Sequence, residues 1–207
     1  MNVFIVYAHP SEDSFTRRIR DRFIAGLESA GHCYTISDLY RMNFRTDMDE
    51  DEYRREAFYR LEAPVPEDVR REQEKINRGD AIVFIYPVFW SDVPAKLKGW
   101  FDRVWTYGFA YGPQNISMKR LEKGLVICSA GNTMDYFRKT GLLQSMERVM
   151  LDDRLHDRVK TRELVILEAT GRATGQATGQ ATGRENSSRE ENWDRHLDRV
   201  FSLARNL

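Results

Sequence analysis

Short apolar runs alternate with longer amphipathic segments along this chain, and the alternation limits its possible folds more than any other feature. Five apolar runs read as strands, at residues 2–7, 32–38, 81–85, 125–129 and 163–167. Five segments with apolar residues at helical spacing read as helices, at residues 15–30, 66–78, 94–105, 137–150 and 192–207. Such alternation favours βαβ units with parallel strands. We therefore predict an α/β fold, a flavodoxin-like, doubly wound, five-stranded parallel sheet with helices on both faces.

The composition fits one globular domain over residues 1–207, because 41% of the residues are hydrophobic and can fill a core. Lysine plus arginine and aspartate plus glutamate number 32 each, so no overall field favours nucleic acid. No apolar run approaches the ~20 residues that span a bilayer, and the first run is too short for a secretory segment. Cys33 and Cys128 lie in separate predicted strands without metal-ligand spacing. We expect a reduced, cytoplasmic protein with no metal site and no stable membrane insertion.

Two polar segments depart from this pattern. The highly charged residues 47–62 read as a surface loop and helix. Residues 169–184 repeat Ala-Thr-Gly-polar every four residues, and nothing in the repeat could bury a core. We therefore predict a flexible surface insertion at 169–186. Its glycines could in principle hold a phosphate, but the repeat lacks the lysine spacing of a P-loop, which makes that alternative weak.

The loop after the third predicted strand has the character of a ligand site. That strand should end at Pro87, because a proline cannot extend a central ladder. Val88, Phe89 and Trp90 follow, and a helix restarts near Pro94. Open α/β sheets bind flat ligands at the carboxyl ends of their strands, and this loop offers backbone amides and an indole face. An isolated Phe-Trp pair more often belongs to a core, but its place after a strand favours a site.

Two further loops should reach the same edge. After the first strand, Ser14 and Thr16 open a helix where hydroxyls and free N–H groups can hold a phosphate, and His9 could add a donor. The alternative is that Asp13 or Ser14 only caps the helix. After the fourth strand, the small residues Ser129, Ala130 and Gly131 let the backbone approach a ligand closely.

Six segments of the chain form an ordered set, at residues 7–10, 14–16, 38–44, 72–75, 87–104 and 108–111. Together and in this order they resemble the NAD(P)H:quinone oxidoreductase family, the DT-diaphorase-like branch of the flavodoxin-like flavoproteins. The block at 93–104 is the most specific of them. The resemblance covers residues 1 to about 150 and implies a flavin, FAD with FMN as the alternative.

The resemblance also implies roles for individual residues. By this resemblance, the flavin phosphate and ribityl groups would be bound by His9, Ser14, Phe15 and Thr16. The isoalloxazine ring would be contacted on one side by Pro87, Val88, Phe89 and Trp90, and on the other by Ser129, Ala130 and Gly131. Tyr136 takes the place of a catalytic tyrosine, and Trp90 and Ser91 contact substrate. Tyr111 would close the pocket of the partner subunit in a homodimer.

The implied function is a flavin-dependent NAD(P)H oxidoreductase that reduces quinones or similar flat acceptors by ping-pong hydride transfer. The sequence departs from the family at two points: Ser91 replaces an aromatic residue, and residues 141–144 lack the histidine that follows the tyrosine in the large animal enzymes. Both departures predict a more open pocket. Two alternatives stay open, a flavin-binding regulatory subunit of a membrane transport system and a flavodoxin-type electron carrier. The carrier would normally be acidic, whereas this chain is neutral.

Overall fold

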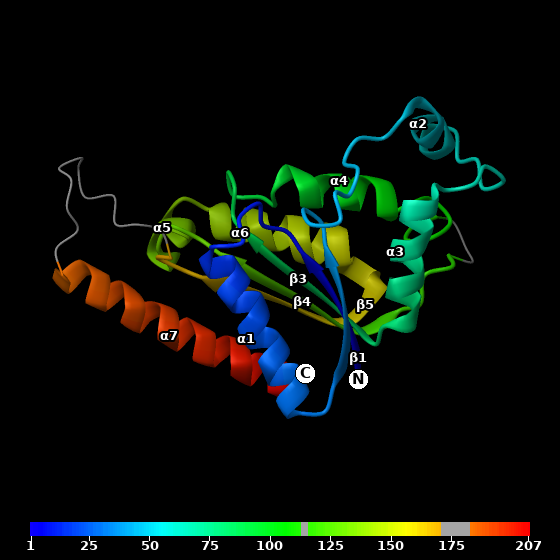
Figure 1. Cartoon of the computed structure of the whole chain (residues 1–207). Coiled ribbons are helices and arrows are strands. Elements are labelled where there is room, and N and C mark those ends of the chain that lie inside the picture. Colours follow the sequence, from blue (N-terminus) through cyan, green and yellow to red (C-terminus); the bar gives the residue numbers. More distant parts are fainter. Residues whose placement is uncertain (113–115, 171–182) are drawn as a thin grey trace.

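The computed structural model describes residues 1–112, 116–170 and 183–207, with the backbone alone for 183–190. Its five strands are β1 (Asn2–Tyr7), β2 (Cys33–Asp38), β3 (Ala81–Pro87), β4 (Leu121–Ser129) and β5 (Val159–Leu167). All neighbouring strands are parallel, in the order β2-β1-β3-β4-β5. The predicted doubly wound, flavodoxin-like sheet is therefore confirmed (Figure 1).

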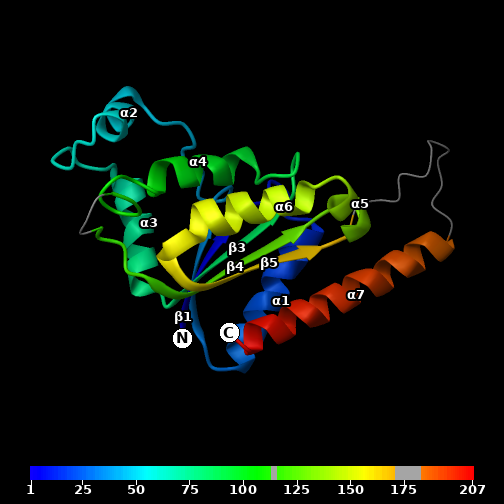
Figure 2. The same cartoon turned by 180° about the vertical axis from the view of Figure 1, so that it is seen from behind.

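Helices cover both faces of this sheet (Figures 1 and 2). One face carries α1 (Phe15–Ser29) and the long C-terminal α7 (Gly183–Arg205). The other face carries α3 (Glu67–Arg78), α4 (Ala95–Val104), α6 (Leu142–Glu147) and the π-helix η1 (Arg148–Leu155). The short helices are α2 (Glu50–Ala57), α5 (Met134–Lys139) and η2 (His156–Arg158). Helix α2 stands away from the sheet, beyond the end of α4 (Figure 1).

Side-chain alternation along the strands divides the core into two layers. In β1, Val3 and Ile5 pack toward α1 and α7, whereas Phe4 and Val6 pack toward α3 and α4. All seven residues of β3 are buried, as expected for a central parallel strand with both faces covered. The edge strand β2 is mostly exposed, which explains its mixed sequence.

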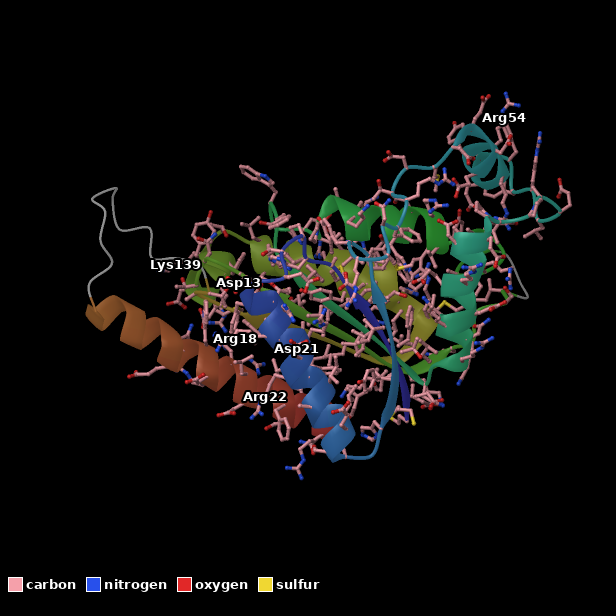
Figure 3. The ribbon with its side chains drawn as sticks, in the orientation of Figure 1. Asp13, Arg18, Asp21, Arg22, Arg54 and Lys139 are labelled. Carbon is pink, nitrogen blue, oxygen red and sulfur yellow. The ribbon has the colours of Figure 1, made fainter. Side chains whose placement is uncertain are left out.

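Helices α1 and α7 pack at very short range. A Cβ atom on Gly26 would lie 2.6 Å from the carbonyl oxygen of Phe201 and 2.7 Å from Cβ of Ala204, so only glycine fits there. Arg18 and Arg22 lie along the same side of α1 (Figure 3), with their guanidinium groups over the rings of Trp193 and Phe201. The arginine stems thus seal the edge of an apolar contact.

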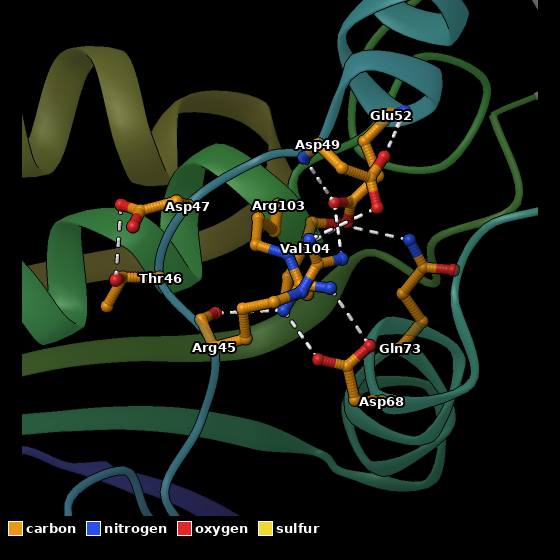
Figure 4. Close-up of polar contacts among 9 residues, drawn as sticks. All are labelled: Arg45, Thr46, Asp47, Asp49, Glu52, Asp68, Gln73, Arg103 and Val104. Atoms are coloured by element: carbon orange, nitrogen blue, oxygen red, sulfur yellow. Dashed lines mark hydrogen bonds and ion pairs between the residues drawn. The ribbon is translucent and has the colours of Figure 1, made fainter.

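The segment before α2 is tied to α4 by a buried charge cluster around Arg103 (Figure 4). The Arg103 side chain has no exposed surface, and its Nε donates to Glu52 Oε1 at 2.8 Å. Its Nη2 donates to Asp68 Oδ1 at 2.9 Å, and its Nη1 donates to the carbonyl of Arg45 at 2.8 Å. The prediction of a surface helix at 47–62 is thus incomplete, because Glu52 is buried as the partner of this arginine.

Several predicted boundaries were wrong for physical reasons. Strand β3 is longer than the predicted run 81–85, but it ends at Pro87 as expected, because that residue has no N–H to continue the ladder. Strands β4 and β5 begin earlier than predicted, at the buried Leu121 and Val159, which charged residues separate from the apolar runs. The predicted helix 137–150 is three pieces: Gly141, with a φ of 74°, separates α5 from α6, and α6 continues directly into the π-helix η1.

The predicted insertion at 169–186 falls mainly on residues 171–182, which lie outside the described part of the chain. Its two ends are described. Thr170 donates to the carbonyl of Ala130 through its N–H at 2.9 Å and its hydroxyl at 3.0 Å. Helix α7 already begins at Gly183, nine residues before the predicted start at Asn192. Residues 183–186, which the prediction placed in the insertion, belong to this helix.

Candidate functional site

The loops after β1, β3 and β4 meet at the carboxyl edge of the sheet. The hydroxyls of Thr16 and Ser129 are hydrogen-bonded at 2.9 Å, which joins the start of α1 to the end of β4. The Val88 N–H donates to the carbonyl of Ser129 at 2.9 Å, which joins the third loop to the same point. Residues 113 positions apart in sequence are thus brought together, as the sheet topology predicts.

The first turn of α1 offers unused donors. Ser14 is the N-cap, and its Oγ accepts the Arg17 N–H at 3.1 Å. The capping role left open by the sequence is therefore real, and the Ser14 side chain also hydrogen-bonds to the Tyr7 hydroxyl. The N–H groups of Phe15 and Thr16 have no partner among the described residues, and they stand at the positive end of a 15-residue helix. This end of α1 can hold an anion.

His9 stands in the loop that leads into α1. Its Nδ1 lies 2.9 Å from the Ser11 nitrogen and 3.0 Å from the Ser11 carbonyl oxygen, and its Nε2 has no partner among the described residues. Burial lowers the pKa of His9, although the contact with the Ser11 carbonyl opposes this shift. The ring is therefore neutral near pH 7 rather than a positive charge.

Three predicted cofactor contacts, Phe15, Thr16 and Ser129, have buried side chains. Phe15 stacks on Trp193 of α7 with ring centroids 4.6 Å apart, so its ring belongs to the core and only its backbone can serve a ligand. Thr16 is 2% exposed and Ser129 is 6% exposed. Their hydroxyls bond to each other and fix the loops beneath the surface.

The loop after β3 forms a tight hairpin. The N–H groups of Phe89 and Asp92 each donate to the other residue's carbonyl at 3.0 Å, so that Trp90 and Ser91 form a two-residue turn. Both have positive φ, 51° and 59°, as in a type I′ turn. This conformation costs a non-glycine residue roughly 1–2 kcal/mol. The Trp90 side chain is fully exposed, so packing within the chain does not repay that cost.

The hairpin corrects one expectation from the sequence. Pro87 has no N–H, and the N–H groups of Val88 and Phe89 are already bonded within the chain. The N–H groups of Trp90 and Ser91, in the same loop, have no partner among the described residues. Donors for a flat ligand are therefore displaced by one to two residues from the predicted stretch.

Asp92 closes the hairpin through a contact that the sequence did not reveal. Its carboxylate accepts from Arg154 Nη1 at 2.7 Å and Nη2 at 3.2 Å, and from the Val93 N–H at 2.7 Å. Burial alone would raise the pKa of Asp92, but the bonds from Arg154 and Val93 outweigh it and lower the pKa. The only sequence signal was a charged residue inside an apolar loop.

The turn after β4 is open above one residue. The N–H and carbonyl of Ala130 are engaged by Leu167 and Thr170, so Ala130 can touch a ligand only through its methyl group. Gly131 is exposed, and a Cβ built on it would meet no atom of the described chain within 4 Å. The N–H groups of Gly131 and Asn132 have no partner among the described residues. This turn can accept a close ligand.

The two predicted tyrosines lie at different places. Tyr136 stands on α5 at the carboxyl edge and is 44% exposed. Tyr111 follows α4, whereas the Trp90 turn precedes that helix, whose ten residues span about 15 Å. The Tyr111 hydroxyl donates to Glu56 Oε2 at 2.9 Å, and burial together with that carboxylate raises the pKa of Tyr111 to about 12. One chain therefore does not bring Tyr111 to the other site residues.

These features suit a flavin mononucleotide moiety. Free N–H groups at the start of α1 match a phosphate, and those of Trp90, Ser91, Gly131 and Asn132 match ring heteroatoms. The exposed faces of Phe89 and Trp90 offer apolar surface beside them. The open space over Gly131 leaves room for a ring edge.

Comparisons with known proteins agree with this geometry. The family model of the flavodoxin-like fold matches residues 1–159. The ribosyldihydronicotinamide dehydrogenase [quinone] of Rattus norvegicus is 33% identical over 156 residues, which cover 68% of this chain and 68% of that protein. The chain belongs to the NAD(P)H:quinone oxidoreductase family of flavodoxin-like proteins.

Two further relatives support this membership. An NAD(P)H:quinone oxidoreductase from Methanothermobacter marburgensis has a solved structure that is 46% identical, with a TM-score of 0.85 over 100% of this chain and 95% of that one. A ribosyldihydronicotinamide dehydrogenase-like protein of Penicillium crustosum is 29% identical over 175 residues, 72% of this chain. The chain spans 65% of the length of that Penicillium protein. By its family the chain is an oxidoreductase.

Proposed function

We propose that this protein is a flavin-dependent NAD(P)H oxidoreductase that reduces quinones or similar flat acceptors by ping-pong hydride transfer. One observation carries the proposal: the Thr16–Ser129 and Val88–Ser129 bonds gather the three loops at one sheet edge, beneath a fully exposed indole. When bound there, a flavin supplies the hydride exchange between NAD(P)H and an acceptor.

The chain's own groups bind the flavin and orient the substrate beside it. The N–H groups of Phe15 and Thr16, with the Nε2 side of the His9 ring, hold the phosphate end. The N–H groups at Trp90 and Gly131 hold the ring and stabilise negative charge that develops on it. Trp90 stacks with the substrate, and Ser91 leaves room for varied acceptors. The Tyr136 hydroxyl has no partner among the described residues and is free to donate at this edge.

The cofactor we propose is FAD, with FMN as the alternative, because the 9–16 loop resembles that of FAD-binding family members. FAD and FMN share the mononucleotide moiety that this edge fits. The mass of the flavin extracted after reconstitution with both decides between them.

The active form we propose is a homodimer in the cytoplasm. Tyr111 lies beyond the far end of α4, and the exposed Trp90 has no cover within its own chain, so a second subunit would complete the pocket.

Hollows of about 300 Å³ and 240 Å³ lie along α3 and at the amino end of β1, and neither is at this edge. Both cysteines are free thiols, as in a reducing compartment. No described helix has the length and apolar character to cross a membrane.

A variant at Gly131 tests the placement of the flavin. A Cβ atom there meets no atom of the described chain within 4 Å, so Gly131→Val should keep the melting temperature of the flavin-free protein. The same side chain would occupy the space proposed for the ring, and flavin retained after gel filtration should fall at least about tenfold. Retention equal to that of the wild type would place the flavin elsewhere.

A further inference from the structure

The Trp90–Ser91 turn is not held by its own side chains. Trp90 is fully exposed, and neither it nor Ser91 makes a side-chain hydrogen bond with any described residue. Both residues have positive φ, a conformation that tryptophan and serine rarely adopt. The shape of the turn must therefore be fixed from its base, at Phe89 and Asp92.

The base of the turn ends on an ion pair with Arg154. Both guanidinium nitrogens of Arg154 reach the two carboxylate oxygens of Asp92, at 2.7 and 3.2 Å. The pair joins residues 62 positions apart; the Arg154 side chain is 7% exposed and that of Asp92 is 45% exposed, so water reaches the pair from the carboxylate side alone. A two-point arginine–carboxylate contact fixes direction as well as distance.

Arg154 is itself held rigidly. Its guanidinium group lies over the ring of Phe101, 4.9 Å from the centroid, and Nη1 contacts Met150 Sδ at 3.0 Å. Its carbonyl accepts the Trp105 Nε1–H at 2.8 Å. Residues of α4 and its C-cap therefore contact both the side chain and the backbone of Arg154. Arg154 lies in η1, and π-helical turns are frequent at functional sites.

We propose that Arg154, acting through Asp92, is a positioning residue that holds the Trp90–Ser91 turn in the shape that presents Trp90 to the ligand. The inference rests on the proposed function for the identity of that ligand. The order of the turn itself does not depend on it. Without the ion pair, the turn relaxes toward conformations with negative φ, and Trp90 moves away from its place above the sheet edge.

The consequence for binding is quantitative. When a site is competent only a fraction of the time, the apparent dissociation constant rises by the inverse of that fraction. A turn that keeps the bound shape about a tenth of the time would raise the KM for the substrate on Trp90 by about tenfold. The turnover rate of the bound complex would change little.

The test compares three variants with a matched control. Arg154→Met keeps length and apolar contact with Phe101 but removes the charge, Arg154→Lys keeps the charge without the fork, and Asp92→Asn removes the other partner. The control is Asp152→Asn, on the same helix as Arg154, which breaks the exposed pair with Arg162 of β5. The first measurement is amide hydrogen exchange of the flavin-free protein at Phe89, Asp92 and Val93.

We expect exchange at these three amides to accelerate at least about tenfold in Arg154→Met and Asp92→Asn, less in Arg154→Lys, and not in the control. Amides of the central strands β1 and β3 should keep their protection. Equal acceleration throughout the sheet would show a merely structural role and overturn the proposal. Unchanged exchange at the turn in both Arg154→Met and Asp92→Asn would overturn it as well, and if one variant fails to fold the other decides.

The second measurement is steady-state kinetics of the flavin-loaded protein. We expect the KM to rise about tenfold in Arg154→Met with kcat within about twofold, and Arg154→Lys to recover part of the loss. A fall in kcat at constant KM would contradict positioning. Wild-type protein that oxidises no NAD(P)H would refute the proposed function, whereas the exchange measurement would still decide whether Arg154 orders the turn.

Discussion

At the scale of single residues, Trp90 combines features that folding alone does not favour. Its side chain is fully exposed, and its backbone has a φ of 51°. A tryptophan there adds nothing to the core and costs roughly 1–2 kcal/mol of backbone strain. Stability and function should therefore respond to its replacement in opposite directions.

Trp90→Gly tests this opposition. Glycine accepts the positive φ, so the free energy of unfolding should stay unchanged or rise by up to about 1 kcal/mol. Loss of the aromatic contact should lower kcat/KM by roughly 3- to 10-fold. Ser91→Gly is the control, since it relieves the neighbouring strain and keeps the indole. A Trp90→Gly enzyme with wild-type kcat/KM would show that the indole touches no substrate.

At the scale of elements, helix α4 connects the candidate site to the rest of the molecule. The Trp90 turn precedes its first residue, Phe101 supports Arg154, and Arg103 anchors the α2 segment. Side chains from one helix thus reach both the site and the distant charge cluster. This explains why the sequence block at 93–104 is so specific.

Arg103→Met should weaken the attachment of α2 to α4. Glu52 is 8% exposed and would keep only Arg45, which is 42% exposed, whereas removal of a buried partner typically costs about 3–5 kcal/mol. Urea denaturation measures the loss. Arg70→Met breaks exposed pairs with Glu67 and Glu74 and should change the free energy of unfolding far less. Equal effects of the two variants would contradict the buried geometry.

The same cluster predicts a pH dependence. Burial alone would raise the pKa of Asp68, but its bonds with Arg103 outweigh it and lower the pKa. A carboxyl with a depressed folded pKa stabilises the fold above its unfolded pKa of about 3.9 and loses that contribution as the pH falls through the folded pKa. The wild type should therefore lose stability below about pH 4 more steeply than Arg103→Met. Parallel curves for the two proteins would exclude this coupling.

Gly26→Ala tests the close contact of α1 with α7. Alanine gains about 1 kcal/mol of helix propensity, but its methyl group would overlap the Phe201 carbonyl and the Ala204 methyl. Overpacking typically costs 1–3 kcal/mol, about the same or more, so the melting temperature should fall. Glu28→Ala on the exposed side of α1 is the control. A more stable Gly26→Ala protein would mean that the two helices are further apart.

At the scale of the whole molecule, the sequence predicted what depends on local pattern. Apolar runs located all five strands, and the strand order brought Thr16 and Ser129 together as expected. The break at Gly141 was missed because apolar residues keep helical spacing across it. The Asp92–Arg154 pair was missed because no periodic pattern relates residues so far apart in the chain. Contacts of this kind follow from packing rather than from local propensity.

The proposed homodimer makes a prediction about shared sites. If Tyr111 serves the partner's pocket, then in a mixed dimer of Trp90→Gly and Tyr111→Ala both changes fall on one site and the other site is intact. After subunit exchange, about a quarter of all sites should regain wild-type kcat/KM. A mixture no more active than the average of its two components would place Tyr111 outside the partner's site.

Anaerobic titration of the flavin-loaded protein tests the central claim most directly. Stopped-flow absorbance would follow the oxidised flavin while NADH, NADPH or a ribosyldihydronicotinamide is added, and then a quinone. We predict that about one equivalent of a dihydronicotinamide bleaches the flavin and that the quinone restores the absorbance with no dihydronicotinamide present, as ping-pong exchange requires. A flavin that binds but that none of the three donors bleaches would contradict the account and favour an electron carrier or a regulatory subunit.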